Sequence, residues 1–186
     1  MTVDELEALL EAGAESPVLD FKASCPWNAP SFAKDILAFS NVEDGGRIVI
    51  GVEDQTFRRQ GISPEHRETF DIDVMRDQVA AYADPHVDFA VEFPMDRGGR
   101  SYVVITVQTF DETPVICRRD STDTRAGILY HRNRNRRAES AAVSNSSDMR
   151  AILELAAVRL IQRWQRLGLA APAAADQRLE DELGGL

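Results

Sequence analysis

The stretch DGGRIVIGVED, residues 44–54, constrains the fold of this chain more than any other part of its sequence. Two glycines make a tight turn, and a short apolar run rich in β-branched residues follows directly over residues 47–52. Such a run is typical of a strand that is buried on both faces. The sequence therefore predicts a central strand, with Glu53 and Asp54 just beyond its end. The turn is not a phosphate-binding P-loop, because the chain contains no GxxxxGK[ST] motif.

Helical and strand patterns surround this central strand without alternating strictly. Apolar spacing predicts helices over 3–12, 31–42 and 71–83. Period-two patterns predict strands over 18–22, 87–93 and 100–107, the last two joined as a hairpin, and two short strands over 114–118 and 127–132. Because the two kinds of element come in runs, the pattern favours an α+β fold, with a mixed β-sheet flanked by helices, over a doubly wound parallel sheet.

The C-terminal part of the chain, from residue 146, is expected to be an appendage to a single domain. We predict one lobe over residues 1–145, a helix over 146–168 and a flexible acidic tail over 169–186. The helix would pack either on the core of its own chain or on a second copy, and we favour the second alternative, a homodimer. Its predicted apolar face consists of Leu153, Leu160, Ile161, Trp164 and Leu167.

Composition points to a reducing compartment and excludes several classes of protein. The two cysteines, Cys25 and Cys117, form no CxxC pair, and the three histidines are scattered, so neither a disulfide framework nor a zinc site is expected. No apolar run approaches the ~18 residues of a membrane span, and the N-terminus lacks the features of a signal peptide. We therefore expect a cytoplasmic protein with no membrane partner. The formal net charge of −10 argues against broad electrostatic binding to nucleic acid.

Three carboxylates are candidates for a metal site. Glu15 and Asp20 flank the entry to the first predicted strand, and Asp54 ends the central one. Carboxylates that meet at one edge of a sheet would suit Mg²⁺ or Mn²⁺, which bind hard oxygen ligands and share them with water and phosphate. In the alternative interpretation, these side chains are solvated and Asp20 pairs with Lys22 on the same strand face.

Arginines are concentrated in one segment despite the acidic net charge. Residues 118–137 contain seven arginines against two aspartates. Arginine and asparagine donors there could hold phosphates, and an aromatic ring could stack on a base; a solvated basic turn is the alternative. The predicted nucleic-acid-binding residues are Arg118, Arg119, Tyr130, Arg132, Arg134, Arg136 and Arg137.

Several of these motifs together resemble those of one known family. LDFK, residues 19–22, resembles the EFK signature of Schlafen-type AlbA-like domains. AFSNVEDGGRIVIGVED, residues 38–54, is similar to the AFANTxGGxLxIGVxD block of that family, and QGI, residues 60–62, is similar to the IxG that follows it. The segment from Tyr130 to Ala138 resembles the closing YxRxGNxTxxA motif. The match runs in order from about residue 15 to residue 143.

The resemblance implies a Schlafen AlbA-like lobe and a nucleic-acid-related activity. Some members are metal-dependent endoribonucleases that cleave tRNA, and their three catalytic carboxylates correspond to Glu15, Asp20 and Asp54, here with Lys22 beside them to stabilise phosphate charge. The function expected by this resemblance is cleavage of tRNA-like RNA with Mg²⁺ or Mn²⁺, in a setting of antiviral defence by analogy. The alternatives are a non-catalytic module that binds DNA or RNA, with or without a partner protein, and an ATP-binding domain.

Overall fold

The computed structural model describes residues 1–54, 56–132 and 139–169 of the chain. Within these residues, four strands form a mixed sheet in the order β1-β2-β5-β4, in which β1 and β2 are parallel and the other pairs are antiparallel. Two smaller sheets pair β3 with β6 and β7 with β8. The strands are β1 (Leu19–Lys22), β2 (Gly46–Ile50), β3 (Ala83–Asp84), β4 (Phe89–Glu92), β5 (Val103–Val107), β6 (Ile116–Cys117), β7 (Tyr130–Arg132) and β8 (Ser140–Ala142).

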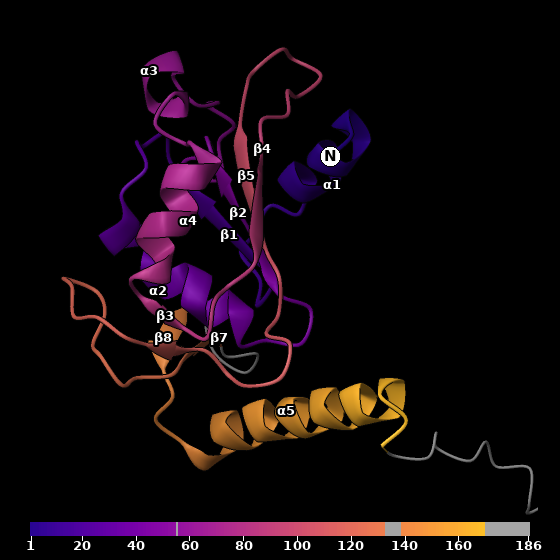
Figure 1. The fold of residues 1–186 in the computed structure, drawn as a ribbon. Coiled ribbons are helices and arrows are strands. Elements are labelled where there is room, and N and C mark those ends of the chain that lie inside the picture. Colours follow the sequence, from indigo (N-terminus) through magenta and orange to yellow (C-terminus); the bar gives the residue numbers. More distant parts are fainter. Residues whose placement is uncertain (55, 133–138, 170–186) are drawn as a thin grey trace, which may run out of the picture.

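Helices cover both faces of the four-stranded sheet. In Figure 1, α1 lies on one side of the sheet, α2 and α4 lie on the other, and α5 runs across one end of the molecule. The predicted α+β fold with a mixed sheet is therefore confirmed. The helices are α1 (Val3–Glu11), α2 (Ala29–Ser40), α3 (Pro64–Arg67), α4 (Ile72–Ala80) and α5 (Ser146–Arg166). None of the helices in the described part of the chain combines the length and the apolar character that a membrane span needs.

Strand β2 is the buried centre of the sheet, as its sequence predicts. Ile48 and Ile50 belong to the larger core, which also contains α2 and α4, while Val49 belongs to a smaller core under α1. All three side chains are fully buried. The central strand thus contributes to two apolar layers at once, and Arg47 near its start is its one exposed residue.

The glycine turn before β2 is a packing feature. A Cβ atom on Gly46 would lie 1.9 Å from the ring of Phe39, so only glycine lets α2 approach the start of the strand this closely. Gly45 has a φ of +64°, in the left-handed region. The interpretation of this segment as a tight turn into a buried strand agrees with that geometry.

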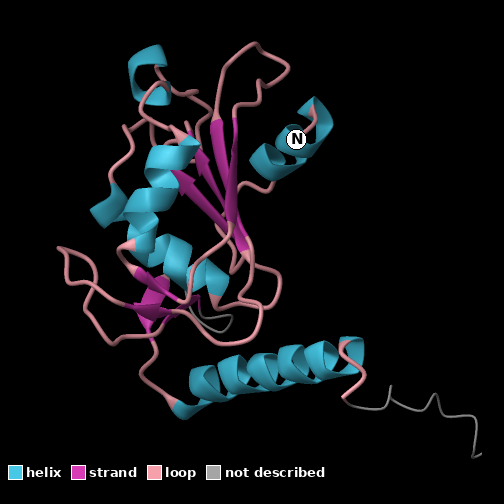
Figure 2. Ribbon diagram, viewed as in Figure 1, coloured by secondary structure: helices cyan, strands magenta, loops and turns pink. Residues whose placement is uncertain are grey.

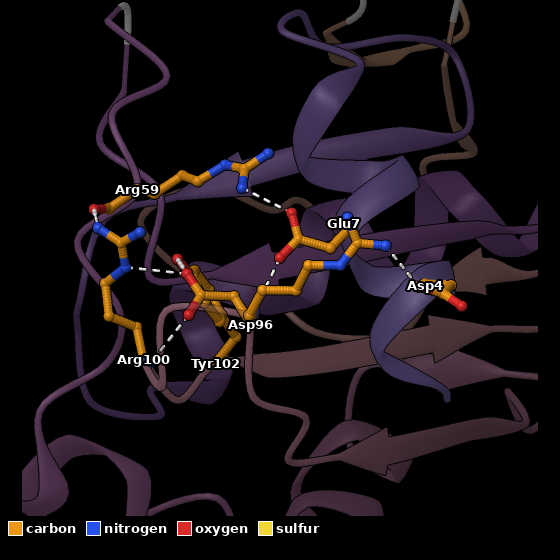
Figure 3. A network of polar contacts seen from close by, with 7 residues as sticks. Asp4, Glu7, Arg59, Asp96, Arg100 and Tyr102 are labelled. Atoms are coloured by element: carbon orange, nitrogen blue, oxygen red, sulfur yellow. Dashed lines mark hydrogen bonds and ion pairs between the residues drawn. The ribbon is translucent and has the colours of Figure 1, made fainter.

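A network of ion pairs and hydrogen bonds attaches α1 to the loop after β2 and to the turn between β4 and β5 (Figure 3). The Glu7 carboxylate is 2.7 Å from Nη1 of Arg59 and accepts a hydrogen bond from the backbone of Arg97. The buried Asp96 carboxylate accepts hydrogen bonds from Arg100 and from the hydroxyl of Tyr102. These contacts fix the loop that follows β2 against the helix at the start of the chain.

Helix α5 makes little contact with the rest of the domain. Asn145 caps its N-terminus by accepting a hydrogen bond from the backbone of Asp148, as the polar sequence there suggests. Ile152 is buried, and Leu155 and Ala156 pack against the larger core. The apolar face predicted from the sequence points elsewhere, because four of its five residues are exposed. Of the predicted tail, only Leu169 lies within the described residues.

Candidate functional site

The candidate site lies at the outer edge of β1, which is an edge strand of the sheet. Leu19 and Phe21 pack under α1, whereas Asp20 and Lys22 face α2 on the other side, as the alternation of the strand predicts. Glu15 precedes the strand and folds back onto its edge, where Oε1 accepts a hydrogen bond from the backbone N–H of Phe21 at 3.3 Å. The edge of this strand therefore carries a carboxylate where a neighbouring strand would otherwise pair.

Asp20 is buried and interacts with two cationic side chains. Its Oδ1 accepts a hydrogen bond from Nη1 of Arg132 at 3.0 Å, and its Oδ2 lies 3.0 Å from Nζ of Lys22. Lys22 also lies 2.7 Å from Oδ2 of Asp35, a buried residue of α2. Burial alone would lower the pKa of Lys22, but the carboxylates of Asp35 and Asp20 raise it above its ordinary value. Lys22 is therefore a fixed positive charge between two carboxylates.

Arg132 is fully buried and joins three parts of the chain. Besides Asp20, its guanidinium donates hydrogen bonds to the carbonyl oxygens of Ser16 and Leu19, at 3.2 and 3.4 Å. The same group stacks over the ring of Phe39 in α2, 4.5 Å from the ring centroid. Arg132 thus ties β7 to the edge of β1 and to α2. The prediction that it contacts nucleic acid at the surface is corrected by this burial.

Asp54 lies in the loop that follows β2. The loop starts where the backbone N–H groups of Gly51 and Val52 donate to the carbonyl oxygen of Lys22, at 2.8 and 3.0 Å. Its backbone turns tightly, because the N–H of Thr56 donates to the carbonyl oxygen of Asp54 at 2.8 Å. Phe57 has a φ of +54° and packs edge-on against Phe21, which holds the loop beside β1.

The surroundings of Glu15 raise its pKa above the ordinary value. Burial raises this pKa above its ordinary value, and the negative charge of Asp20 raises it further. The hydrogen bond from Phe21 and the charge of Arg132 act in the opposite direction, and Asp54 adds a smaller upward effect. The convergence of Glu15, Asp20 and Asp54 on one site stays a prediction from the sequence.

The chemistry of these groups suits a hard divalent cation, but the arrangement is not a complete metal cage. Hard oxygen donors gather at the edge of β1, and a cation there would relieve the repulsion that raises the pKa of Glu15. Both oxygens of Asp20, however, are already engaged by Arg132 and Lys22. Among residues 1–54, 56–132 and 139–169, no group of three or more His, Cys, Asp and Glu side chains is placed to hold one ion.

Of the four predicted nucleic-acid-binding residues that the structure describes, two are exposed and two are buried. Arg118 and Arg119 are exposed, and the guanidinium of Arg119 lies 5.7 Å from the ring centroid of Tyr82. Tyr130 is buried, and its hydroxyl accepts a hydrogen bond from the backbone of Arg125, so its ring is not available for stacking on a base. The predictions for Arg134, Arg136 and Arg137 fall outside the described residues.

Sequence reasoning overlooked Asp35 as a partner in the site. The residue lies on the buried side of α2, between Phe32 and Phe39, where apolar residues recur at helical spacing. A charged residue on such a face is rarely buried without a partner. That position in the helical pattern is the signal that could have singled it out, although the pattern does not identify Lys22 as the partner.

Comparison with known proteins agrees with this fold and these motifs. The geometry defines the class of the protein: it is an α+β domain with a mixed sheet and with carboxylates at the edge of that sheet. Residues 15–140 match the family described as Schlafen, AlbA_2. The chain therefore belongs to the Schlafen AlbA_2 family. No curated protein is similar enough in sequence to count as a match.

Two solved structures share the fold. One is the DIP2311 protein from Corynebacterium diphtheriae, with a TM-score of 0.51 and 20% identity over 80% of this chain. This chain spans 31% of the DIP2311 chain. The other is the N-terminal domain of a protein from Nitrosomonas europaea whose name relates it to the ATP-dependent DNA helicase RecG. It has a TM-score of 0.51 and 20% identity, over 68% of this chain and 86% of that domain.

The raised pKa of Glu15 has a consequence for stability. A carboxyl group whose pKa is higher in the folded than in the unfolded protein binds more protons when folded, so stability rises as the pH falls from neutral through that raised pKa. We expect Glu15→Gln, which keeps an acceptor for the Phe21 N–H, to raise the urea midpoint at pH 7 and to flatten this part of the pH profile. Exposed Glu11→Gln is the control, and equal profiles for the wild type and Glu15→Gln would contradict the expectation.

Proposed function

We propose that this domain binds RNA and cleaves it with the help of Mg²⁺ or Mn²⁺ at the edge of β1. The observation that carries the proposal is the gathering of carboxylates at the edge of β1, where Glu15 binds the N–H of Phe21 and the buried Asp20 lies 3.0 Å from Nζ of Lys22. Membership of the Schlafen AlbA_2 family supports an association with nucleic acid. Carboxylate clusters beside a fixed lysine are suited to phosphodiester chemistry.

Each residue has a distinct part in the proposed site. Glu15 and Asp54 would hold the metal ion, and Asp20 would join them once one of its oxygens is released from Lys22 or Arg132. When bound, the ion neutralises phosphate charge and makes its coordinated water more acidic. Lys22 remains protonated and places a positive charge beside the phosphate. Asp35 keeps Lys22 oriented toward the carboxylates.

The substrate in this proposal is a tRNA-like RNA. The net charge of −10 means that binding depends on local basic groups rather than on the whole surface. Arg118, Arg119 and Arg125 are exposed and lie close together in the chain, so they are candidates for phosphate contacts. A role in antiviral defence, and the involvement of a partner protein, belong to the proposal by analogy with the family.

A second candidate function is binding of DNA or RNA without cleavage. The engagement of both Asp20 oxygens by Arg132 and Lys22 favours it, because a carboxylate held in this way acts as a structural counter-ion. The two candidates differ in their dependence on Asp54: cleavage requires this residue, whereas binding alone does not.

The test is incubation of the purified protein with total tRNA in the presence of Mg²⁺, Mn²⁺ or EDTA. Asp54→Asn is compared with Asp77→Asn, which changes an exposed carboxylate on α4. We expect discrete products that need the metal, and a loss of rate on the order of 100-fold or more in Asp54→Asn alone, since metal-site substitutions act on that scale. Intact tRNA in every lane, together with retained binding in a filter assay, would support the binding module instead.

A further inference from the structure

The outward side of α5 concentrates large apolar side chains that the rest of the molecule does not cover. Figure 2 shows α5 as a long helix at one end of the domain, with its far side turned away from the sheet. Seven of the thirteen large hydrophobic residues that are exposed in the described part of the chain lie between Met149 and Leu169. An exposed patch of this kind marks an interaction surface.

These side chains are separate from those that attach the helix to its own domain. Attachment involves Ile152, Leu155 and Ala156, together with an ion pair between Arg163 and Glu112. An adjoining side of the helix carries a second row of apolar residues, which we call the outer stripe. The outer stripe consists of Met149, Leu153, Leu160, Ile161, Trp164 and Leu167.

The spacing of the outer stripe is that of a helix that pairs with another helix. From Leu153, residues 157, 160, 164 and 167 follow at alternating intervals of four and three, which is the heptad spacing of a coiled-coil seam, and Met149 extends the seam by about one turn. At 1.5 Å per residue the seam is about 27 Å long. The seam combines five residues of the outer stripe with Ala157 at its centre, and all of its residues are apolar.

We infer that the outer stripe is a dimer interface, and that its occupant is α5 of a second copy of this chain, running antiparallel. A twofold axis near the middle of the seam places Leu153 of one copy against Trp164 of the other, and Ala157 against Leu160. Leu153 and Trp164 then meet at the two ends of the contact, and the small Ala157 leaves room for Leu160 at its centre, so that the two helices can approach closely. The stripe is therefore complementary to itself.

The available area reaches the lower limit of a biological interface, which suits a dimer that dissociates on dilution. Each large side chain of the outer stripe that is about half exposed offers on the order of 100 Å², so the two copies together bury about 1,000 Å². Nucleic acid fits the stripe poorly, because its backbone selects cationic surfaces. An anionic membrane is also disfavoured, because it repels a chain with a net charge of −10. The inference concerns assembly and stands apart from the proposed cleavage of RNA.

The test is sedimentation velocity of the full chain over a range of concentrations, with and without added salt. The wild type is expected to sediment as a dimer that dissociates on dilution. Its association should not weaken as the salt concentration increases. The Leu153→Glu/Trp164→Glu variant should associate at least about 30-fold more weakly, because buried aromatic and aliphatic anchors dominate such interfaces. Gln162→Glu changes an exposed residue on another side of the same helix and should leave the dimer intact.

A fluorescence measurement keeps the inference open to disproof if the double variant does not fold. The chain has two tryptophans, so Trp27→Phe leaves Trp164 as the reporter. Dimerisation through the outer stripe should shift its emission to shorter wavelength as concentration rises, over the range in which the mass doubles. A monomer at all concentrations, or a dimer in which the emission of Trp164 does not change, would overturn the inference.

Discussion

Replacing Arg132 with methionine is expected to lower the free energy of unfolding by about 3–5 kcal/mol, the usual cost of breaking a buried ion pair from one side. Arg132 has no solvent exposure and is one of two cations that engage the buried Asp20 carboxylate. Its loss also leaves the carbonyl oxygens of Ser16 and Leu19 without their hydrogen bonds from this side chain. Methionine preserves much of the apolar contact with α2, so the effect reports mainly on charge and hydrogen bonding.

The measurement is urea unfolding of Arg132→Met beside Arg118→Met, which changes an exposed arginine of the same basic segment. Adding Asp20→Asn to Arg132→Met removes the uncompensated charge and should restore part of the lost stability. If Arg132→Met is no less stable than Arg118→Met, the buried pair does not exist in solution. A double variant less stable than the sum of its parts would likewise contradict the pairing.

Asn41→Ala is expected to cost about 3 kcal/mol or more, because it leaves buried backbone groups without partners. The side chain of Asn41 is buried at the end of α2. Its amide donates to the carbonyl oxygens of Val115 and Tyr130, each at 2.9 Å, and its oxygen accepts from the backbone N–H of Val115 at 2.8 Å. One side chain thus joins α2 to the segments before β6 and in β7.

Thermal and urea unfolding of Asn41→Ala should be compared with Asn145→Ala, which removes an exposed helix cap and should cost only about 1 kcal/mol. The order of the two effects is the decisive quantity. Equal losses would show that water replaces the three hydrogen bonds of Asn41, and would place this region of the core at the surface.

The elements that sequence patterns predicted well are those whose pattern depends on burial alone. The run from Arg47 to Val52 gave the central strand, and the alternation of residues 19–22 gave the correct faces of β1. In each case a local pattern carried the information.

What the sequence did not reveal depends on contacts between distant segments. Arg132 lies among other arginines, and nothing in that segment marks its guanidinium as the buried one. Its partner Asp20 is 112 residues away in the chain. Helix α5 shows the same limit: its apolar residues predicted a face, but Ile152 rather than Leu153 makes the contact with the core. Helix propensity and apolar periodicity describe one element at a time. Which arginine and which face of α5 become buried depends instead on how the elements pack together.

The edge of β1 also affects the resistance of the folded protein to aggregation. An edge strand presents backbone groups that can pair with a strand from another molecule, which starts aggregation. Here the N–H of Phe21 is occupied by Glu15, and the carbonyl oxygen of Leu19 by Arg132. The side chains proposed for catalysis and stability therefore also act as a cap on the sheet, so a variant that loses them should form β-rich aggregates at protein concentrations where the wild type stays clear.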